Sequence, residues 1–147
     1  GLAAAGELRI VTWPAGHWFH VAATFDNQNL YDITALSETA QLGNGPGGFA
    51  YVPAGSPGFP SQSLIVAEWS PSGPDQDRVV TYEVDAQGDP TVSTRKEFFT
   101  LFPRPWGAYF EPVTGDYLFL TWGATPPDRV YLVQGFVPPP PPPPPPN

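Results

Sequence analysis

The 147-residue chain contains no cysteine and no methionine. Without cysteine it can form neither a disulfide nor a thiolate metal site. Its stability must come from a packed core, which sets it apart from the small disulfide-stapled class of secreted domains. The chain opens Gly-Leu-Ala-Ala-Ala-Gly. We interpret this opening as an N-terminus left by removal of a signal segment, or as the start of a fragment.

Basic residues and long apolar runs are scarce as well. Lysine and arginine together number six against 14 acidic residues, which gives a net charge of −8. No basic face is available to displace counterions from nucleic acid or to attract an anionic membrane. The longest apolar runs, such as 64–67 and 117–121, are too short to cross a bilayer. We therefore expect no nucleic-acid partner and no membrane insertion.

Charged residues of both signs make up only 14% of the chain, whereas about 25% is usual for a soluble domain. Aromatic residues also make up 14%. A weakly charged, aromatic surface favours packing against copies of the same chain or a coat of sugar.

Helical periodicity is absent, and the 15 glycines and 22 prolines argue against long helices. Short runs rich in β-branched and aromatic residues, bounded by Gly, Pro, Asn or Asp, are typical of strands. The sequence predicts strands at residues 8–13, 18–25, 30–36, 48–52, 64–69, 78–84, 94–102, 106–110, 117–122 and 129–136.

An internal repeat relates two parts of the chain, at about 48–103 and 106–136. Each copy has glycine with aromatics and proline, then an apolar strand that ends in tryptophan, then Asp-Arg-Val. A period near 50 residues with three or four strands is the size of a propeller blade. A fainter third copy begins near residue 19.

The runs Asp-Arg-Val-Val-Thr-Tyr-Glu-Val-Asp-Ala-Gln-Gly-Asp-Pro and Gly-Asp-Tyr-Leu-Phe-Leu-Thr-Trp-Gly resemble blades of secreted bacterial β-propeller proteins. The resemblance covers about 45–137, and it implies an extracellular or cell-surface protein without implying an activity. The strand pattern and the repeat predict an all-β domain over 1–137 with antiparallel, propeller-blade-like sheets, and a two-sheet β-sandwich is the alternative. Because a propeller needs at least four blades, either several chains complete a ring or the sheets stack.

The chain contains residue types that bind metals or act in catalysis, but they do not occur in the patterns that these functions require. His17 and His20 flank Trp18 and Phe19, and at three residues apart they would face opposite sides of a strand. No further histidine exists to complete a metal site. Asp85, Gln87 and Asp89 only loosely resemble a calcium loop, so we interpret 85–90 as a turn. No nucleotide-binding or nucleophile motif occurs. We expect no enzyme activity, no cofactor and no metal; candidates for a glycosidase-type carboxylate pair are Glu68, Glu83, Glu111 and Asp116.

The five tryptophans divide into two groups. Trp69 and Trp122 occupy equivalent positions in the repeat, which predicts core packing. Trp13, Trp18 and Trp106 lie within two residues of proline or glycine, near strand ends. Aromatic faces grip proline rings and stack on sugars. We therefore expect these three to form a groove for a proline-rich segment.

The chain ends in nine consecutive prolines and Asn147. Proline fixes φ and lacks an N–H, so the run predicts a polyproline II rod about 28 Å long. We expect the tail, 138–147, to serve assembly or recognition. Its candidate binding residues are Pro138, Pro139, Pro140, Pro141, Pro142, Pro143, Pro144, Pro145 and Pro146.

Three hypotheses of function follow from this sequence. The first is an extracellular structural subunit that assembles with copies of itself into a filament or fibril, with the tail as connector. The second is a carbohydrate-binding cell-surface module with the tail as its stalk, or with O-linked glycan on the tail. The third is a fragment of a propeller hydrolase.

Overall fold

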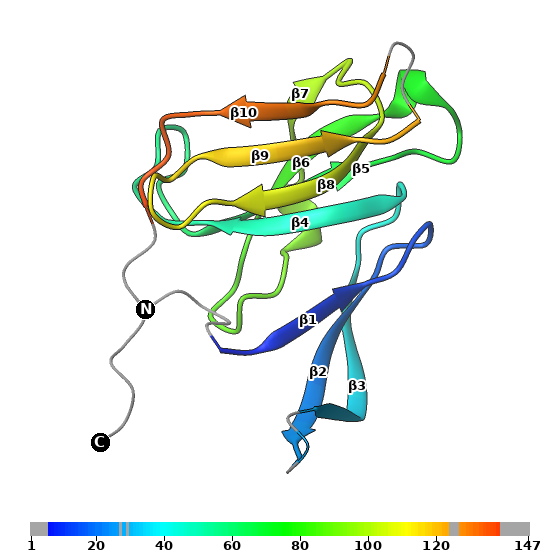
Figure 1. The fold of residues 1–147 in the computed structure, drawn as a ribbon, viewed down its shortest axis with the longest axis vertical. Coiled ribbons are helices and arrows are strands. Elements are labelled where there is room, and N and C mark those ends of the chain that lie inside the picture. Colours follow the sequence, from blue (N-terminus) through cyan, green and yellow to red (C-terminus); the bar gives the residue numbers. More distant parts are fainter. Residues whose placement is uncertain (1–5, 27, 29, 124–126, 139–147) are drawn as a thin grey trace.

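The computed structural model describes residues 6–26, 28, 30–123 and 127–138. All of its regular structure beyond two short 3₁₀ turns is antiparallel β-sheet (Figure 1). The part of the chain so described contains no helix long and apolar enough to span a membrane. The strands are β1 (Leu8–Val11), β2 (His17–Phe25), β3 (Tyr31–Gln41), β4 (Pro46–Val52), β5 (Ser63–Glu68), β6 (Arg78–Glu83), β7 (Lys96–Thr100), β8 (Pro105–Phe110), β9 (Tyr117–Thr121) and β10 (Val130–Val133).

The strands form three sheets in the orders β1-β2-β3, β4-β5-β6-β7 and β10-β9-β8. We call them the N-terminal, central and C-terminal sheets. The prediction of an all-β, antiparallel protein is confirmed. The main difference in length concerns β3, which runs on to Gln41 because the polar residues after Leu36 still pair with β2. The β2–β3 hairpin projects beyond the other sheets (Figure 1).

The central sheet is the middle layer of three. All six residues of β5 are buried. Leu64 and Val66 pack with Trp18 of the N-terminal sheet, whereas Ile65 packs with Phe119 of the C-terminal sheet. Alternate side chains thus fill two separate cores on the two faces of one strand. The arrangement is neither a two-sheet sandwich nor, in the described residues, a closed propeller ring.

Glycines let the central and C-terminal sheets approach closely where β4 meets β8. A Cβ on Gly48 would lie 2.5 Å from the backbone nitrogen of Ala108. A Cβ on Gly47 would lie 2.5 Å from the carbonyl oxygen of Trp106. Any larger residue would push the two backbones apart, so these glycines set the spacing of the layers.

The chain leaves the domain at one end of the C-terminal sheet. Phe136 packs against Phe59 and Tyr117, with ring centroids 5.9 and 5.7 Å apart. The Val137 N–H donates to Ser56 Oγ at 3.0 Å, so the start of the tail is anchored. The predicted rod from Pro139 to Pro146 lies outside the described residues.

Candidate functional site

Four tryptophans meet at the other end of the sheets from the tail. Trp13 comes from the β1–β2 turn, Trp69 follows β5, Trp106 lies at the start of β8 and Trp122 follows β9. Neighbouring rings have centroid separations from 5.2 to 6.1 Å. Such tilted and edge-to-face packing is favourable for aromatic rings. We call this group the tryptophan cluster.

The cluster is held in place by its own hydrogen bonds and by close backbone contacts. Trp13 Nε1 donates to the Trp69 carbonyl oxygen at 3.1 Å, and Trp69 Nε1 donates to the Trp122 carbonyl oxygen at 3.2 Å. A Cβ on Gly45 would lie 2.4 Å from the carbonyl oxygen of Trp69. These contacts join all three sheets, so the rings are set before any ligand arrives.

A buried acid supports the cluster from inside. Asp77 accepts the Ser70 N–H at 2.8 Å and the Arg104 N–H at 3.1 Å. The Arg104 guanidinium carbon lies 4.1 Å from the centre of the Trp69 ring, within cation–π range. Burial raises the pKa of the Asp77 carboxyl, although these N–H groups and the Arg104 charge favour its ionised form.

One side of the cluster is open to solvent. Trp13 and Trp122 are 44% and 54% exposed. A pocket of about 290 Å³ lies beside them, lined by Trp106, Leu120, Thr121, Trp122 and Asp128. Within the described part of the chain, no hydrogen bond involves the indole N–H of Trp106 or Trp122. The site therefore offers flat apolar rings together with two donors.

The outer face of the C-terminal sheet continues from this pocket. Strand register places Gly107, Leu120 and Val130 in one row, while Tyr109, Leu118 and Leu132 form the next. Neither row contains a charged residue, and most of these side chains are exposed.

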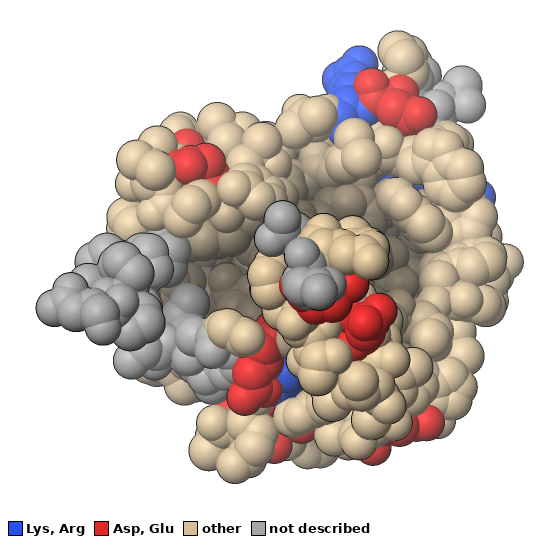
Figure 2. All heavy atoms as spheres, turned by 60° about the horizontal axis from the view of Figure 1, so that its bottom comes forward, with Lys and Arg blue, Asp and Glu red and all other residues tan. Residues whose placement is uncertain are grey.

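The outer face of the N-terminal sheet is apolar over most of its length, with the His17–Glu38 pair at one end. Register aligns Leu8, Val21 and Leu36 across it, and Ala23–Ile33 and Phe25–Tyr31 pairs extend it along the hairpin. Leu8, Phe25, Tyr31, Ile33 and Leu36 are all exposed. Figure 2, viewed toward the lower end of Figure 1, shows the charged groups in small separate clusters on a largely uncharged surface.

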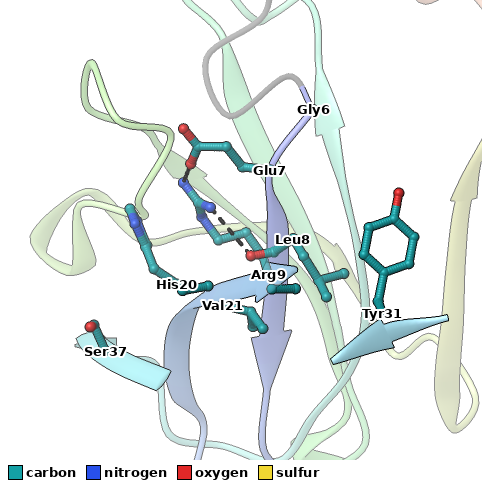
Figure 3. Close-up of a pocket in the computed structure, with 10 residues that line it drawn as sticks. Gly6, Glu7, Leu8, Arg9, His20, Val21, Tyr31 and Ser37 are labelled. Atoms are coloured by element: carbon teal, nitrogen blue, oxygen red, sulfur yellow. Dashed lines mark hydrogen bonds and ion pairs between the residues drawn. The ribbon is translucent and has the colours of Figure 1, made fainter. Parts of the chain in front are cut away.

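Another pocket, of about 710 Å³, lies at the N-terminal sheet (Figure 3). Its lining includes Arg9, His20 and Tyr31. Arg9 donates to Glu7 Oε2 at 2.5 Å and to the Gln87 carbonyl oxygen at 2.9 Å, which fixes its guanidinium against the wall. The pocket combines an aromatic ring with fixed polar groups.

Of the three tryptophans predicted to form a groove, the structure brings together Trp13 and Trp106. Trp18 is fully buried, with its Nε1 donating to Asp89 Oδ1 at 3.1 Å, so it cannot line a groove. It packs edge-to-face against Phe49, with ring centroids 4.6 Å apart, and anchors the N-terminal sheet to the central sheet.

The two histidines are held by acids. His17 Nδ1 lies 2.7 Å from Glu38 Oε1, and His20 Nε2 lies 2.5 Å from Asp89 Oδ1. Across the described ranges, no three His, Cys, Asp or Glu side chains gather as a metal site would require. The Asp85 carboxylate accepts the N–H groups of Gln87 and Asp89, as in a structural turn.

Of the four candidate carboxylates, Glu111 and Asp116 lie together in one turn, whereas Glu68 and Glu83 lie elsewhere. Glu68 is buried between Arg95, whose Nη2 is 2.6 Å away, and Tyr82. Burial raises the pKa of Glu68 despite the Arg95 hydrogen bond and charge. A polar pocket of about 230 Å³ lies beside it. Glu83 ends β6. In the β8–β9 turn the Thr114 hydroxyl lies 2.9 Å from Glu111 Oε2 and 2.8 Å from Asp116 Oδ2, and it can donate its proton to either one.

Sequence reasoning missed Trp69 and Trp122 as members of the site. The prediction that Trp122 packs in a core is wrong, because half of the residue is exposed. Their equivalent positions in the repeat were a usable signal, since equivalent strand ends of two packed sheets lie side by side.

The chain matches no protein-family model, no curated protein and no solved structure.

Proposed function

We propose that this chain is an extracellular structural subunit that assembles with copies of itself into a filament, with the proline tail linking neighbouring subunits. One observation carries the proposal: the stack of three sheets ends in an exposed apolar face on both sides. Soluble monomers rarely expose two such patches, and large ones mark sites of association.

The two faces differ, and this difference favours an open polymer. One end of the stack is the N-terminal sheet and the other is the C-terminal sheet, since they cover opposite faces of the central sheet. A copy that packs its C-terminal sheet on the neighbour's N-terminal sheet leaves the same two faces free. Such head-to-tail contacts continue as a filament, or close as a ring of blades if the rotation permits.

The edge strand β3 adds a second means of association. It is 11 residues long, and among the described residues it pairs on one side only, with β2. Natural proteins protect long edge strands with proline, charged side chains, bulges or a covering loop. β3 contains neither proline nor lysine, and its protection is limited to Asp32, Glu38 and two register shifts against β2. Its unpaired backbone groups favour contact with another copy.

Electron microscopy and sedimentation velocity of the purified chain test the proposal. We expect filaments from the full chain. Leu120→Lys with Leu132→Lys places two charges on the outer face of the C-terminal sheet and should prevent filaments. Val113→Lys, which changes an exposed residue of the β8–β9 turn, is the matched control and should leave them intact. A wild-type chain that stays monomeric at high concentration contradicts the proposal.

A carbohydrate-binding module is the second candidate, favoured by the 710 Å³ pocket with Tyr31, Arg9 and His20 (Figure 3). Aromatic rings beside fixed polar groups suit sugars. On a glycan array, binding that Tyr31→Ala removes would support this function. An array with no signal above background would leave self-assembly as the better proposal.

A further inference from the structure

We propose that the tryptophan cluster is a binding site for polyproline II, and that its ligand is the proline tail of another copy of the chain. The inference rests on the proposed function, because it identifies the surface that receives the connector. The occupant is a named segment of this chain, residues 139–146, which lies outside the described structure.

The chemistry of the cluster suits this ligand. A polyproline II helix has no internal hydrogen bonds, so its carbonyl oxygens are free to accept. Grooves that bind proline-rich segments are lined by aromatic rings that pack on proline rings. Trp13, Trp106 and Trp122 supply such rings, and within the described residues no hydrogen bond engages the indole N–H groups of Trp106 and Trp122.

The cluster is also arranged before binding. Two indole N–H groups are already used on the carbonyl oxygens of Trp69 and Trp122, and these bonds tie the rings to the ends of β5 and β9. The ligand is stiff as well, since proline has a fixed φ. Association of two ordered surfaces loses little conformational entropy.

The path of the chain favours a neighbour's cluster over its own. Thr121 N donates to the Arg129 carbonyl oxygen, so the β10 segment starts beside Trp122. From there β10 runs to Val133, which pairs with Tyr117 at the far end of β9. Gly115 then lies against Phe136 and Pro138, where the tail begins (Figure 1).

The tail therefore starts at the end of the sheet opposite the tryptophan cluster, roughly 16 Å away along β9. A stiff rod that leaves there would have to reverse along the sheet to reach its own cluster. The cluster of a second copy needs no reversal, so the tail links subunits head to tail.

The test uses a full-length variant in which residues 139–146 are replaced by Gly-Ser repeats, so that no proline tail competes for the cluster. A synthetic nine-proline peptide is titrated into it, and tryptophan fluorescence is followed. We expect saturable binding that Trp122→Ala weakens about tenfold or more, as for an aromatic anchor at the centre of an interface. Val113→Ala, which changes an exposed apolar residue of the β8–β9 turn outside both the cluster and the outer sheet face, is the control and should bind unchanged.

Two outcomes overturn the inference. One is absence of saturable binding, or binding that Trp122→Ala does not weaken. The other is a wild-type chain whose dilute, monomeric form already shows the peptide-bound spectrum, which places the tail on its own cluster. Filaments of the full chain without peptide binding would reject this site and leave the proposed function standing. Peptide binding by a chain that never polymerises would support this site and contradict the proposed function.

Discussion

The central sheet and the two outer sheets are built from similar strands but differ in how they are covered. β5 places Leu64 and Val66 on one side and Ile65 on the other, and both sides are buried. β9 likewise places Phe119 inward and Leu120 outward, but only the inner side is covered. Apolar residues on both faces of a strand normally indicate two neighbouring layers.

Within the described residues, therefore, no further layer covers the apolar outer faces of the two outer sheets. Each apolar face of the central sheet packs against another sheet of the same chain. On the outer sheets, a second copy of the chain can supply the missing layer. The predictions below therefore contrast inner positions, which should control stability, with outer positions, which should control association.

The largest effect is expected at the buried ion pair of the central layer. Arg95→Ala leaves the Glu68 carboxylate buried without its charge partner, which costs about 3–5 kcal/mol of unfolding free energy at neutral pH. Glu68→Gln removes the buried charge itself, so it should lower the unfolding free energy clearly less than Arg95→Ala does. Urea denaturation followed by circular dichroism measures both. Equal losses in the two variants would show that charge burial is not what matters at this position.

Truncations on the inner and outer sides of a sheet should differ sharply. Ile65→Ala opens a cavity between the central and C-terminal sheets and should lower the unfolding free energy by about 2–5 kcal/mol. Leu120→Ala, on the exposed outer face, should change that of the monomer by no more than about 0.5 kcal/mol. The same denaturation experiment in dilute solution compares them. A large loss for Leu120→Ala would mean that the outer face is already covered within the chain.

A smaller effect should appear in the pH dependence. Burial raises the folded-state pKa of Glu68, so the fold binds this proton more tightly than the unfolded chain does. The cost of the buried charge is present above the raised pKa and is relieved as pH falls toward the ordinary glutamate value. Relative to Glu68→Gln, the wild-type chain should gain stability as the pH falls from 7 to 4. A difference that stays constant or moves the other way contradicts this account.

The sequence predicted all ten strands, because turn residues bound each apolar run. It did not predict that β3 continues through Ser37 and Glu38, since polar residues on an exposed strand carry no burial signal. It placed Trp18 in a groove and Trp122 in a core, the reverse of what the structure shows. Proximity to glycine or proline locates a strand end, but only the packing of the sheets decides which strand ends meet.

The most direct test of self-assembly through the outer faces mixes two full-length variants that each block one face. One carries Ile33→Lys and Leu36→Lys, the other carries Leu120→Lys and Leu132→Lys, and both have Gly-Ser tails so that only the sheets can join them. By sedimentation velocity we predict monomers for each variant alone and a two-chain complex for the mixture, because one intact face of each kind remains. A mixture that stays monomeric while the unblocked Gly-Ser-tailed chain associates would contradict pairing of the two faces.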